Sequence, residues 1–118
     1  MLRVGSVVIR VSEIPRMAAF WCAALDLEPR DGPLDPAVDF VVLRPRDGLG
    51  PNVSLDLKPS RYELPPRFHL DLYSDDRAAE VARLVALGAR EVHWAKREPD
   101  ADFVILEDPE GNRFCVIG

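Results

Sequence analysis

The sequence has few of the residues that would give a small protein covalent or metal cross-links. Its 118 residues include only two cysteines, Cys22 and Cys115, and two histidines. The cysteines are far apart and form no C-x-x-C pair, which excludes a disulfide scaffold and a zinc knuckle. A hydrophobic core must therefore hold the chain together, and 118 residues with 47% hydrophobic content are enough to build one.

Long apolar runs are also absent, since no segment approaches the ~20 residues of a membrane-spanning helix. The N-terminal run MLRVGSVVIRV has no signal-peptide pattern, so we expect a cytoplasmic protein. With 15 basic and 20 acidic residues, the net charge is −5, which disfavours nucleic acid and anionic membranes as partners. The motifs of phosphate-binding loops, serine hydrolases and zinc proteases are missing too.

Proline, by contrast, is abundant, with 11 residues against 7 glycines. Eight of the prolines lie between Pro29 and Pro66, and the tightest group falls in residues 58–66. Because proline breaks helices and central strands, we predict a linker there. It would join a first module, residues 1–58, to a second module, residues 67–118, within a single domain of residues 1–118.

The two modules resemble each other in sequence. Asp39–Leu43 reads DFVVL, and Asp102–Leu106 reads DFVIL 63 residues later. At the same offset, the alternating segment that begins at Ser6 corresponds to the segment that begins at His69. A glycine follows the DFVVL and DFVIL segments in both halves. Several matches in order at one offset indicate an internal duplication.

Hydrophobic periodicity predicts a β-α-β-β-β order in each half. The predicted strands are 6–11, 39–44 and 52–57 in the first half, and 67–72, 90–94, 103–107 and 113–116 in the second. Ser12 is a candidate cap for a first helix whose apolar stripe runs from Met17 through Phe20 and Trp21 to Leu25. Ser74 or Asp75 is a candidate cap for a second helix, whose stripe holds Val81, Leu84, Val85 and Gly88.

Each predicted strand has one apolar face and one polar face. The apolar face can bury itself against the helix of its own module. A polar strand face meets water or, where two sheets lie side by side and curve, lines a cavity. The residues expected on the polar faces are Ser6, Arg10, Ser54, Asp56, Arg67, His69, Asp71, Arg113 and Cys115.

The segment Asp108–Phe114, DPEGNRF, resembles the D-P-x-G-N turn before the last strand of the vicinal oxygen chelate superfamily. This superfamily contains glyoxalases, extradiol dioxygenases, and fosfomycin and bleomycin resistance proteins. The chain is most similar to glyoxalase-like proteins of unassigned function. The resemblance implies an α+β fold of two tandem βαβββ modules whose mixed sheets curve together into an open cup. It also implies a homodimer.

Metal enzymes of the superfamily place a ligand on the first and last strands of each module, commonly His and Glu. Carried over one residue at a time, these positions fall on Ser6, Ser54, His69 and Cys115, and only His69 keeps the usual ligand type. We therefore expect no cofactor. The alternative is a divalent metal at His69 and Cys115, with Asp56 as a third ligand if its side chain points inward.

His69 is the candidate catalytic residue, because an imidazole titrates near neutral pH and can act as acid or base. The residues predicted to bind a ligand are Ser6, Ser54, Asp56, His69 and Cys115. Each has a structural alternative: His69 can bond a neighbour, and Cys115 can be a small packed side chain. Charged residues of the polar face, such as Asp71, can pair with one another or orient a substrate.

The favoured function is a small-molecule-binding protein that holds an organic ligand in the cup without the usual metal site. The alternative is a lyase or isomerase that acts through His69, either metal-free or with a non-standard metal site. A third reading is a structural or regulatory partner protein. The metal content of the purified protein, with His69→Ala as a control, separates the first two.

Overall fold

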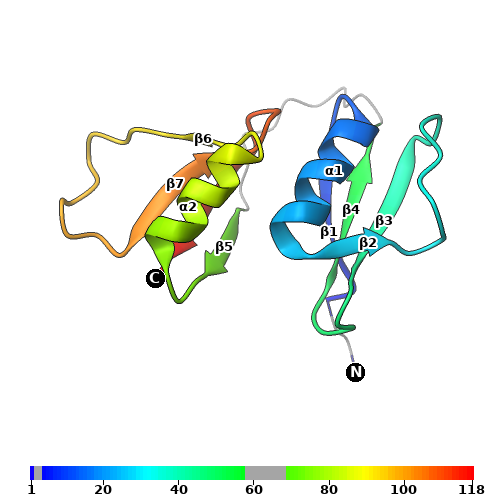
Figure 1. The fold of residues 1–118 in the computed structure, drawn as a ribbon, viewed down its shortest axis with the longest axis horizontal. Coiled ribbons are helices and arrows are strands. Elements are labelled where there is room, and N and C mark those ends of the chain that lie inside the picture. Colours follow the sequence, from blue (N-terminus) through cyan, green and yellow to red (C-terminus); the bar gives the residue numbers. More distant parts are fainter. Residues whose placement is uncertain (2–3, 58–68) are drawn as a thin grey trace. The chain divides into compact units, whose positions relative to one another are not determined.

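A computed structural model of the chain describes residues 1, 4–57 and 69–118. The linker predicted at 58–66 lies outside these residues, as does the start of the strand predicted at 67–72. The chain divides into two compact units, Met1–Tyr62 and Glu63–Gly118, which we call unit one and unit two (Figure 1).

Unit one is a four-stranded mixed sheet with one helix. Its elements are β1 (Ser6–Arg10), α1 (Ile14–Leu25), β2 (Leu27–Pro29), β3 (Phe40–Pro45) and β4 (Asn52–Asp56). The strand order is β1-β4-β3-β2. β1 runs parallel to β4, and the other pairs are antiparallel. The short strand β2 is the one that no pattern in the sequence located.

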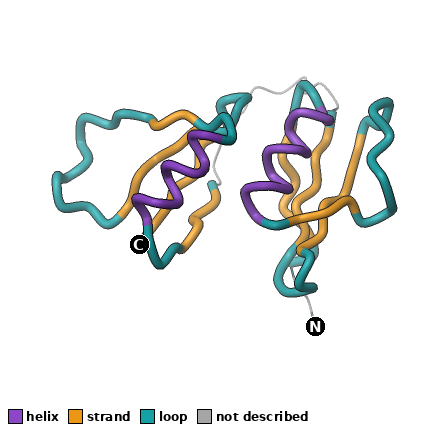
Figure 2. Tube along the Cα trace, in the orientation of Figure 1, coloured by secondary structure: helices purple, strands orange, loops and turns teal. Residues whose placement is uncertain are grey.

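Unit two repeats this arrangement. Its elements are β5 (Leu70–Tyr73), α2 (Arg77–Ala86), β6 (Arg90–Glu91), β7 (Phe103–Glu107) and β8 (Arg113–Ile117). The strand order is β5-β8-β7-β6, with β5 parallel to β8. In each unit the helix lies across one face of its own sheet (Figure 2). The predicted α+β fold of two βαβββ modules is confirmed.

The sheet register supports the internal duplication. Val8 of β1 is the partner of Ser54 of β4, and Asp71 of β5 is the partner of Cys115 of β8. Val8 and Asp71 are 63 residues apart, whereas Ser54 and Cys115 are 61 apart. The offset falls because the turn before the last strand is shorter in unit two. Ser54 and Cys115 therefore hold equivalent places, as the resemblance implied.

The core of unit one lies between α1 and the sheet. Met17, Phe20 and Trp21 are no more than 3% exposed, and the two aromatic rings meet edge to face with centroids 5.1 Å apart. They pack with Leu43 and Leu55 of the sheet, which are fully buried. The helical stripe predicted from the sequence is thus the stripe that packs.

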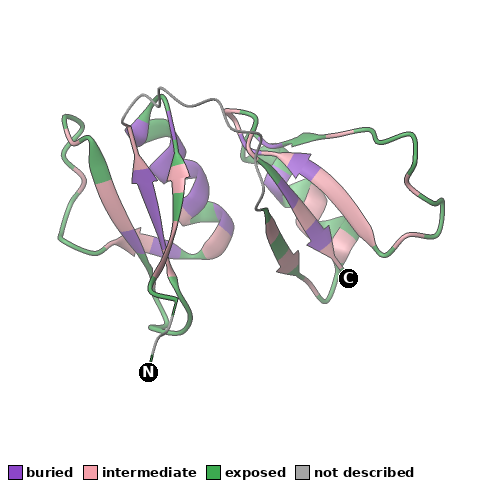
Figure 3. Cartoon of the chain, turned by 180° about the vertical axis from the view of Figure 1, so that it is seen from behind, coloured by how far each residue is buried: buried purple, intermediate pink, exposed green. Residues whose placement is uncertain are grey.

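The core of unit two is built mainly by the sheet. Leu106, Phe114 and Val116 are buried, while alternate residues of β8 are not, which confirms the predicted period of two (Figure 3). α2 contributes only Leu84 as a buried residue. Val85, predicted to share that stripe, is 45% exposed, so this part of the prediction is wrong.

Four local predictions also need correction. α1 is preceded by Glu13 and not by Ser12, and it has no side-chain cap hydrogen bond, because Pro15 already occupies its first turn. Asp76, not Ser74 or Asp75, caps α2 by accepting a hydrogen bond from the Ala79 amide at 3.1 Å. The strand predicted at 90–94 ends at Glu91, and α2 ends at Ala86, before the predicted Gly88.

The DPEGN turn owes its shape to Asp108. This carboxylate is 3% exposed and accepts hydrogen bonds from the backbone amides of Glu110 and Asn112, at 3.0 and 2.9 Å. Its other oxygen accepts from the Asn112 side chain at 2.7 Å. Gly111 has a φ of 88°, in the region that favours glycine. The motif therefore encodes a turn that aligns β7 with β8.

Among the described residues, no helix is both long enough and apolar enough to cross a membrane.

Candidate functional site

The sheet of unit two has one face against α2 and one face turned away from it. The strand register places Asp71, Cys115 and Ile105 side by side on the face turned away, because paired residues of neighbouring strands share a face. Phe103 and Ile117 are the next pair along the same face. We call these residues, together with His69, the outer face of unit two.

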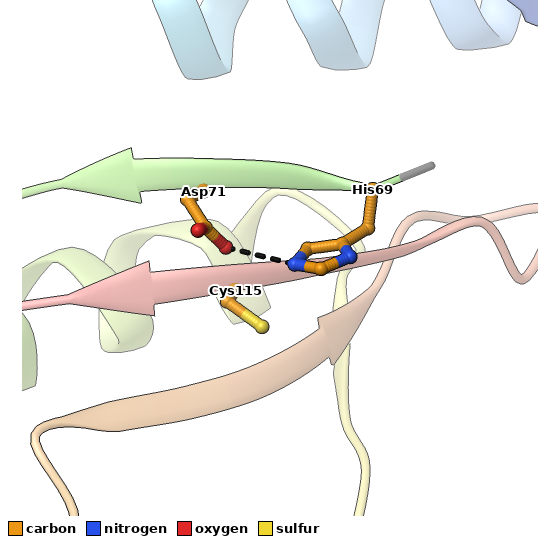
Figure 4. A group of neighbouring side chains, drawn as sticks. All are labelled: His69, Asp71 and Cys115. Atoms are coloured by element: carbon orange, nitrogen blue, oxygen red, sulfur yellow. Dashed lines mark ion pairs between the residues drawn. The ribbon is translucent and has the colours of Figure 1, made fainter. Parts of the chain in front are cut away.

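Three donor side chains converge on this face. His69 Nε2 lies 3.0 Å from Asp71 Oδ1. One ligand atom from each of His69, Asp71 and Cys115 lies within 4.8 Å of the other two. Figure 4 shows that the carboxylate and the thiol both lie toward the Nε2 side of the imidazole, while Nδ1 is on the far side of the ring. We call these three residues the His69 cluster.

The pair of His69 and Asp71 contributes little to folding. Their side chains are 58% and 45% exposed, and ion pairs in such positions stabilise proteins by about 0–1 kcal/mol. The clearer effect of Asp71 is to orient the ring and to fix the nitrogen that carries the proton. An exposed, oriented imidazole is suited to contact a molecule from solution.

Cys115 completes the cluster as a protonated thiol. Burial raises its pKa above the ordinary value of 9.0, and the negative charge of Asp71 raises this pKa further. The nucleophilic form is the thiolate, so at neutral pH this cysteine is a weak nucleophile. The environment of Cys115 favours contact with a ligand over attack on it.

An apolar strip continues from the cluster along the outer face. Ile105 is the partner of Cys115, and Phe103 lies two residues further along β7. The Trp94 ring is 6.4 Å from the Phe103 ring, centroid to centroid. The Arg97 guanidinium lies 5.6 Å from the centre of the Phe103 ring. This strip offers aromatic and aliphatic surface beside the polar cluster.

The equivalent positions of unit one carry different chemistry. Ser6 and Ser54 take the places of His69 and Cys115, and their hydroxyl oxygens lie 2.5 Å apart in a hydrogen bond. Ser54 is 1% exposed. Val8 stands where unit two has Asp71. The titratable donors of this strand pair are thus confined to unit two.

The structure groups the predicted site residues in two sets. His69 and Cys115 come together in unit two, and Ser6 and Ser54 come together in unit one. Asp56 ends β4 in unit one, and its role as a ligand contact stays a prediction. Asp71, which the sequence ranked below His69, joins the cluster. The signal for it was its spacing of two from His69, which puts both side chains on one strand face.

The fold and the cluster together define a protein of paired βαβββ modules with donor groups on the first and last strands of its second module. Comparison with protein families then gives a match between residues 6–117 and the glyoxalase-like domain. The chain belongs to the glyoxalase-like domain family, which confirms the resemblance to the vicinal oxygen chelate superfamily.

Solved structures agree with this assignment. A member of the glyoxalase/bleomycin resistance protein/dioxygenase superfamily from Sphaerobacter thermophilus DSM 20745 is 28% identical, with a TM-score of 0.68 over 99% of this chain and 97% of the other. A family enzyme from Burkholderia phytofirmans PsJN is 21% identical, with a TM-score of 0.69 over 95% and 94%. A glyoxalase-related enzyme from Fulvimarina pelagi is 15% identical, with a TM-score of 0.70 over 99% and 88%.

A search of curated proteins gives no match. The likenesses to the last two structures, both under 25% identical, show the fold alone. The activity of this chain must therefore be argued from its own site.

Proposed function

We propose that this protein binds a small organic molecule on the outer face of unit two, with His69 as its main polar contact. The observation that carries the proposal is the exposed, Asp71-oriented imidazole beside an apolar strip. Binding sites for small molecules combine apolar walls with a few placed polar groups, and this face has both.

His69 can recognise either a donor or an acceptor. When the imidazole is neutral and Nε2–H donates to Asp71, the Nδ1 lone pair is free to accept a hydrogen bond from a ligand hydroxyl. When the imidazole is protonated, Nδ1–H donates instead, which suits a carboxylate. The polar part of the ligand is therefore expected to be a hydroxyl or an acid group.

The apolar strip sets the rest of the ligand. Ile105 and Phe103 are half-buried, and Trp94 is 45% exposed beside them. Aromatic side chains of this kind favour a flat or aliphatic group. A molecule with a hydroxyl or carboxylate at one end and a ring or short chain at the other fits these contacts.

Loss of the usual metal ligands at three positions supports binding that does not use the four-ligand metal site of the family. Ser6 and Ser54 are poor ligands when neutral, and their hydroxyls bond each other. Polar contacts from the protein would then hold the ligand in place of a metal. This is the respect in which the chain departs most from metal-dependent relatives.

The test is a ligand-observed NMR screen of small aromatic and aliphatic acids and alcohols, run in EDTA. We expect hits whose signal is lost in His69→Ala and weakened several-fold in Asp71→Asn. His93→Ala is the matched control, since His93 is the other histidine of the chain and is exposed. Hits that bind His69→Ala as well as they bind the wild type would refute the proposal.

A second candidate function is a lyase or isomerase reaction in which His69 moves a proton. The pairing with Asp71 favours it, because a carboxylate that orients an imidazole also stabilises its protonated form. Any ligand found in the screen can be incubated with the protein in D₂O. Exchange of a carbon-bound proton that disappears in His69→Ala would establish this activity, and binding without exchange would leave the binding function alone.

Ser6, Ser54 and Asp56 remain predicted ligand contacts. Ser54→Ala and Asp56→Asn test them in the same screen. If these residues share one ligand with His69 and Cys115, both variants weaken the same hits.

A further inference from the structure

We propose that His69, Asp71 and Cys115 form a zinc site lying entirely within unit two. One imidazole nitrogen, one carboxylate oxygen and one sulfur would bind the ion, and water would complete a four-coordinate shell. The site goes beyond the binding function proposed above, because it needs no organic ligand.

The distances are close to those that zinc requires. Ligand atoms at ~2.0–2.3 Å from a tetrahedral zinc ion lie about 3.3–3.8 Å from one another. In the structure the three donor atoms lie within 4.8 Å of one another, and His69 Nε2 and Asp71 Oδ1 are 3.0 Å apart. Small rotations that part this pair and bring in the thiol would form the shell. The exposed imidazole and carboxylate have room for these rotations.

The arrangement of the donors favours an ion over a proton relay. A relay from Cys115 to Asp71 would place them at opposite nitrogens of His69. Figure 4 shows both groups toward the Nε2 side of the ring instead. Donors that surround one point in this way are suited to share a cation.

The donor types select the metal. Magnesium and calcium prefer oxygen ligands, whereas sulfur and imidazole together with a carboxylate suit zinc. Three protein ligands leave one position for water, as in zinc sites that act on substrates. Cys115 would bind as the thiolate and release its proton to solvent when the ion enters.

This ligand set differs from the set that the resemblance implied. Those positions come from both modules, and in unit one they are now Ser6 and Ser54. Asp71 lies outside them and is valine, Val8, in unit one. The cluster therefore belongs to unit two alone.

The experiment uses the full chain, stripped with EDTA and reduced. We expect one Zn²⁺ per chain by competition with a chromogenic chelator. We also expect Co²⁺ to give a near-ultraviolet charge-transfer band, which requires a thiolate ligand. Cys115→Ser should abolish that band, and His69→Ala and Asp71→Asn should each weaken metal binding by at least about tenfold.

Matched controls are His93→Ala, Asp75→Asn and Cys22→Ser, which change the same residue types elsewhere and should bind metal as the wild type does. Circular dichroism checks that every variant is folded. The proposal is overturned if no stoichiometric zinc binds, if the cobalt band depends on Cys22, or if Asp71→Asn binds as tightly as the wild type. Failure here leaves the organic-ligand screen unaffected, because that screen is run in EDTA.

Discussion

At the scale of single residues, the account depends on what surrounds Cys115 and Asp71. The sequence indicated that His69 and Cys115 share a polar strand face, because both follow a period of two. It did not show that Asp71 reaches the imidazole, since a strand face holds several charged residues that could pair otherwise. Side-chain rotamers decide that contact, and periodicity carries no information about them.

The pKa of Cys115 gives a prediction about reactivity. Burial and Asp71 both raise this pKa, so the thiolate forms only above pH 9.0. Alkylation by iodoacetamide should be slow at pH 7 and rise with pH until above 9. The measurement is made on Cys22→Ser, in EDTA, so that one thiol is followed. Asp71→Asn should shift the pH profile downward, and a profile with its midpoint near pH 7 would show that the environment is different.

The carboxylate of Asp108 gives a prediction about stability. Asp108→Ala removes the acceptor of three hydrogen bonds in a buried turn. We expect the free energy of unfolding to fall by about 2–4 kcal/mol, measured by urea denaturation. Asp100→Ala, in an exposed turn, is the control and should change it by less than about 0.5 kcal/mol. Equal effects of the two variants would mean that the turn does not depend on Asp108.

At the scale of elements, the strands and helices were predictable and their ends were not. Alternation in β8 and the stripe of α1 follow directly from burial on one face. The shortest strands, β2 and β6, have too few residues to show a period. The cap of α2 depends on which of three neighbouring polar residues points back to the helix, and that residue is Asp76.

The weak packing of α2 leads to an element-scale prediction. Leu84 is its buried residue, so Leu84→Ala should lower the free energy of unfolding by about 2–4 kcal/mol. Val85→Ala, at an exposed position, should change it by less than about 0.5 kcal/mol. Urea denaturation followed by circular dichroism measures both. A larger loss from the Val85 variant would show that the packed face of α2 is assigned incorrectly.

At the scale of the whole molecule, the sequence predicted two similar modules because duplicated segments keep their spacing. It could not predict the change of offset to 61 in the last strand, which follows from the length of one turn. The identity of the ligand was also beyond it. The outer face of unit two now narrows that identity to an acid or alcohol with an apolar group.

The assembly we propose is a homodimer. β1 and β5 are at the edges of their sheets, where strands can pair with another chain. Each carries an exposed apolar residue, Val8 at 56% and Tyr73 at 84%. Light scattering during size-exclusion chromatography should give about twice the chain mass of 13.2 kDa. A mass of one chain across the tested concentrations would contradict this.

The most direct test of the central claim is a ¹H–¹⁵N NMR titration with a ligand from the screen. The account predicts that the largest amide shifts fall in residues 69–73, 103–107 and 113–117, and that His69→Ala removes them. The result that would contradict it is a set of shifts centred outside these three strands, or the same shifts in the His69→Ala protein.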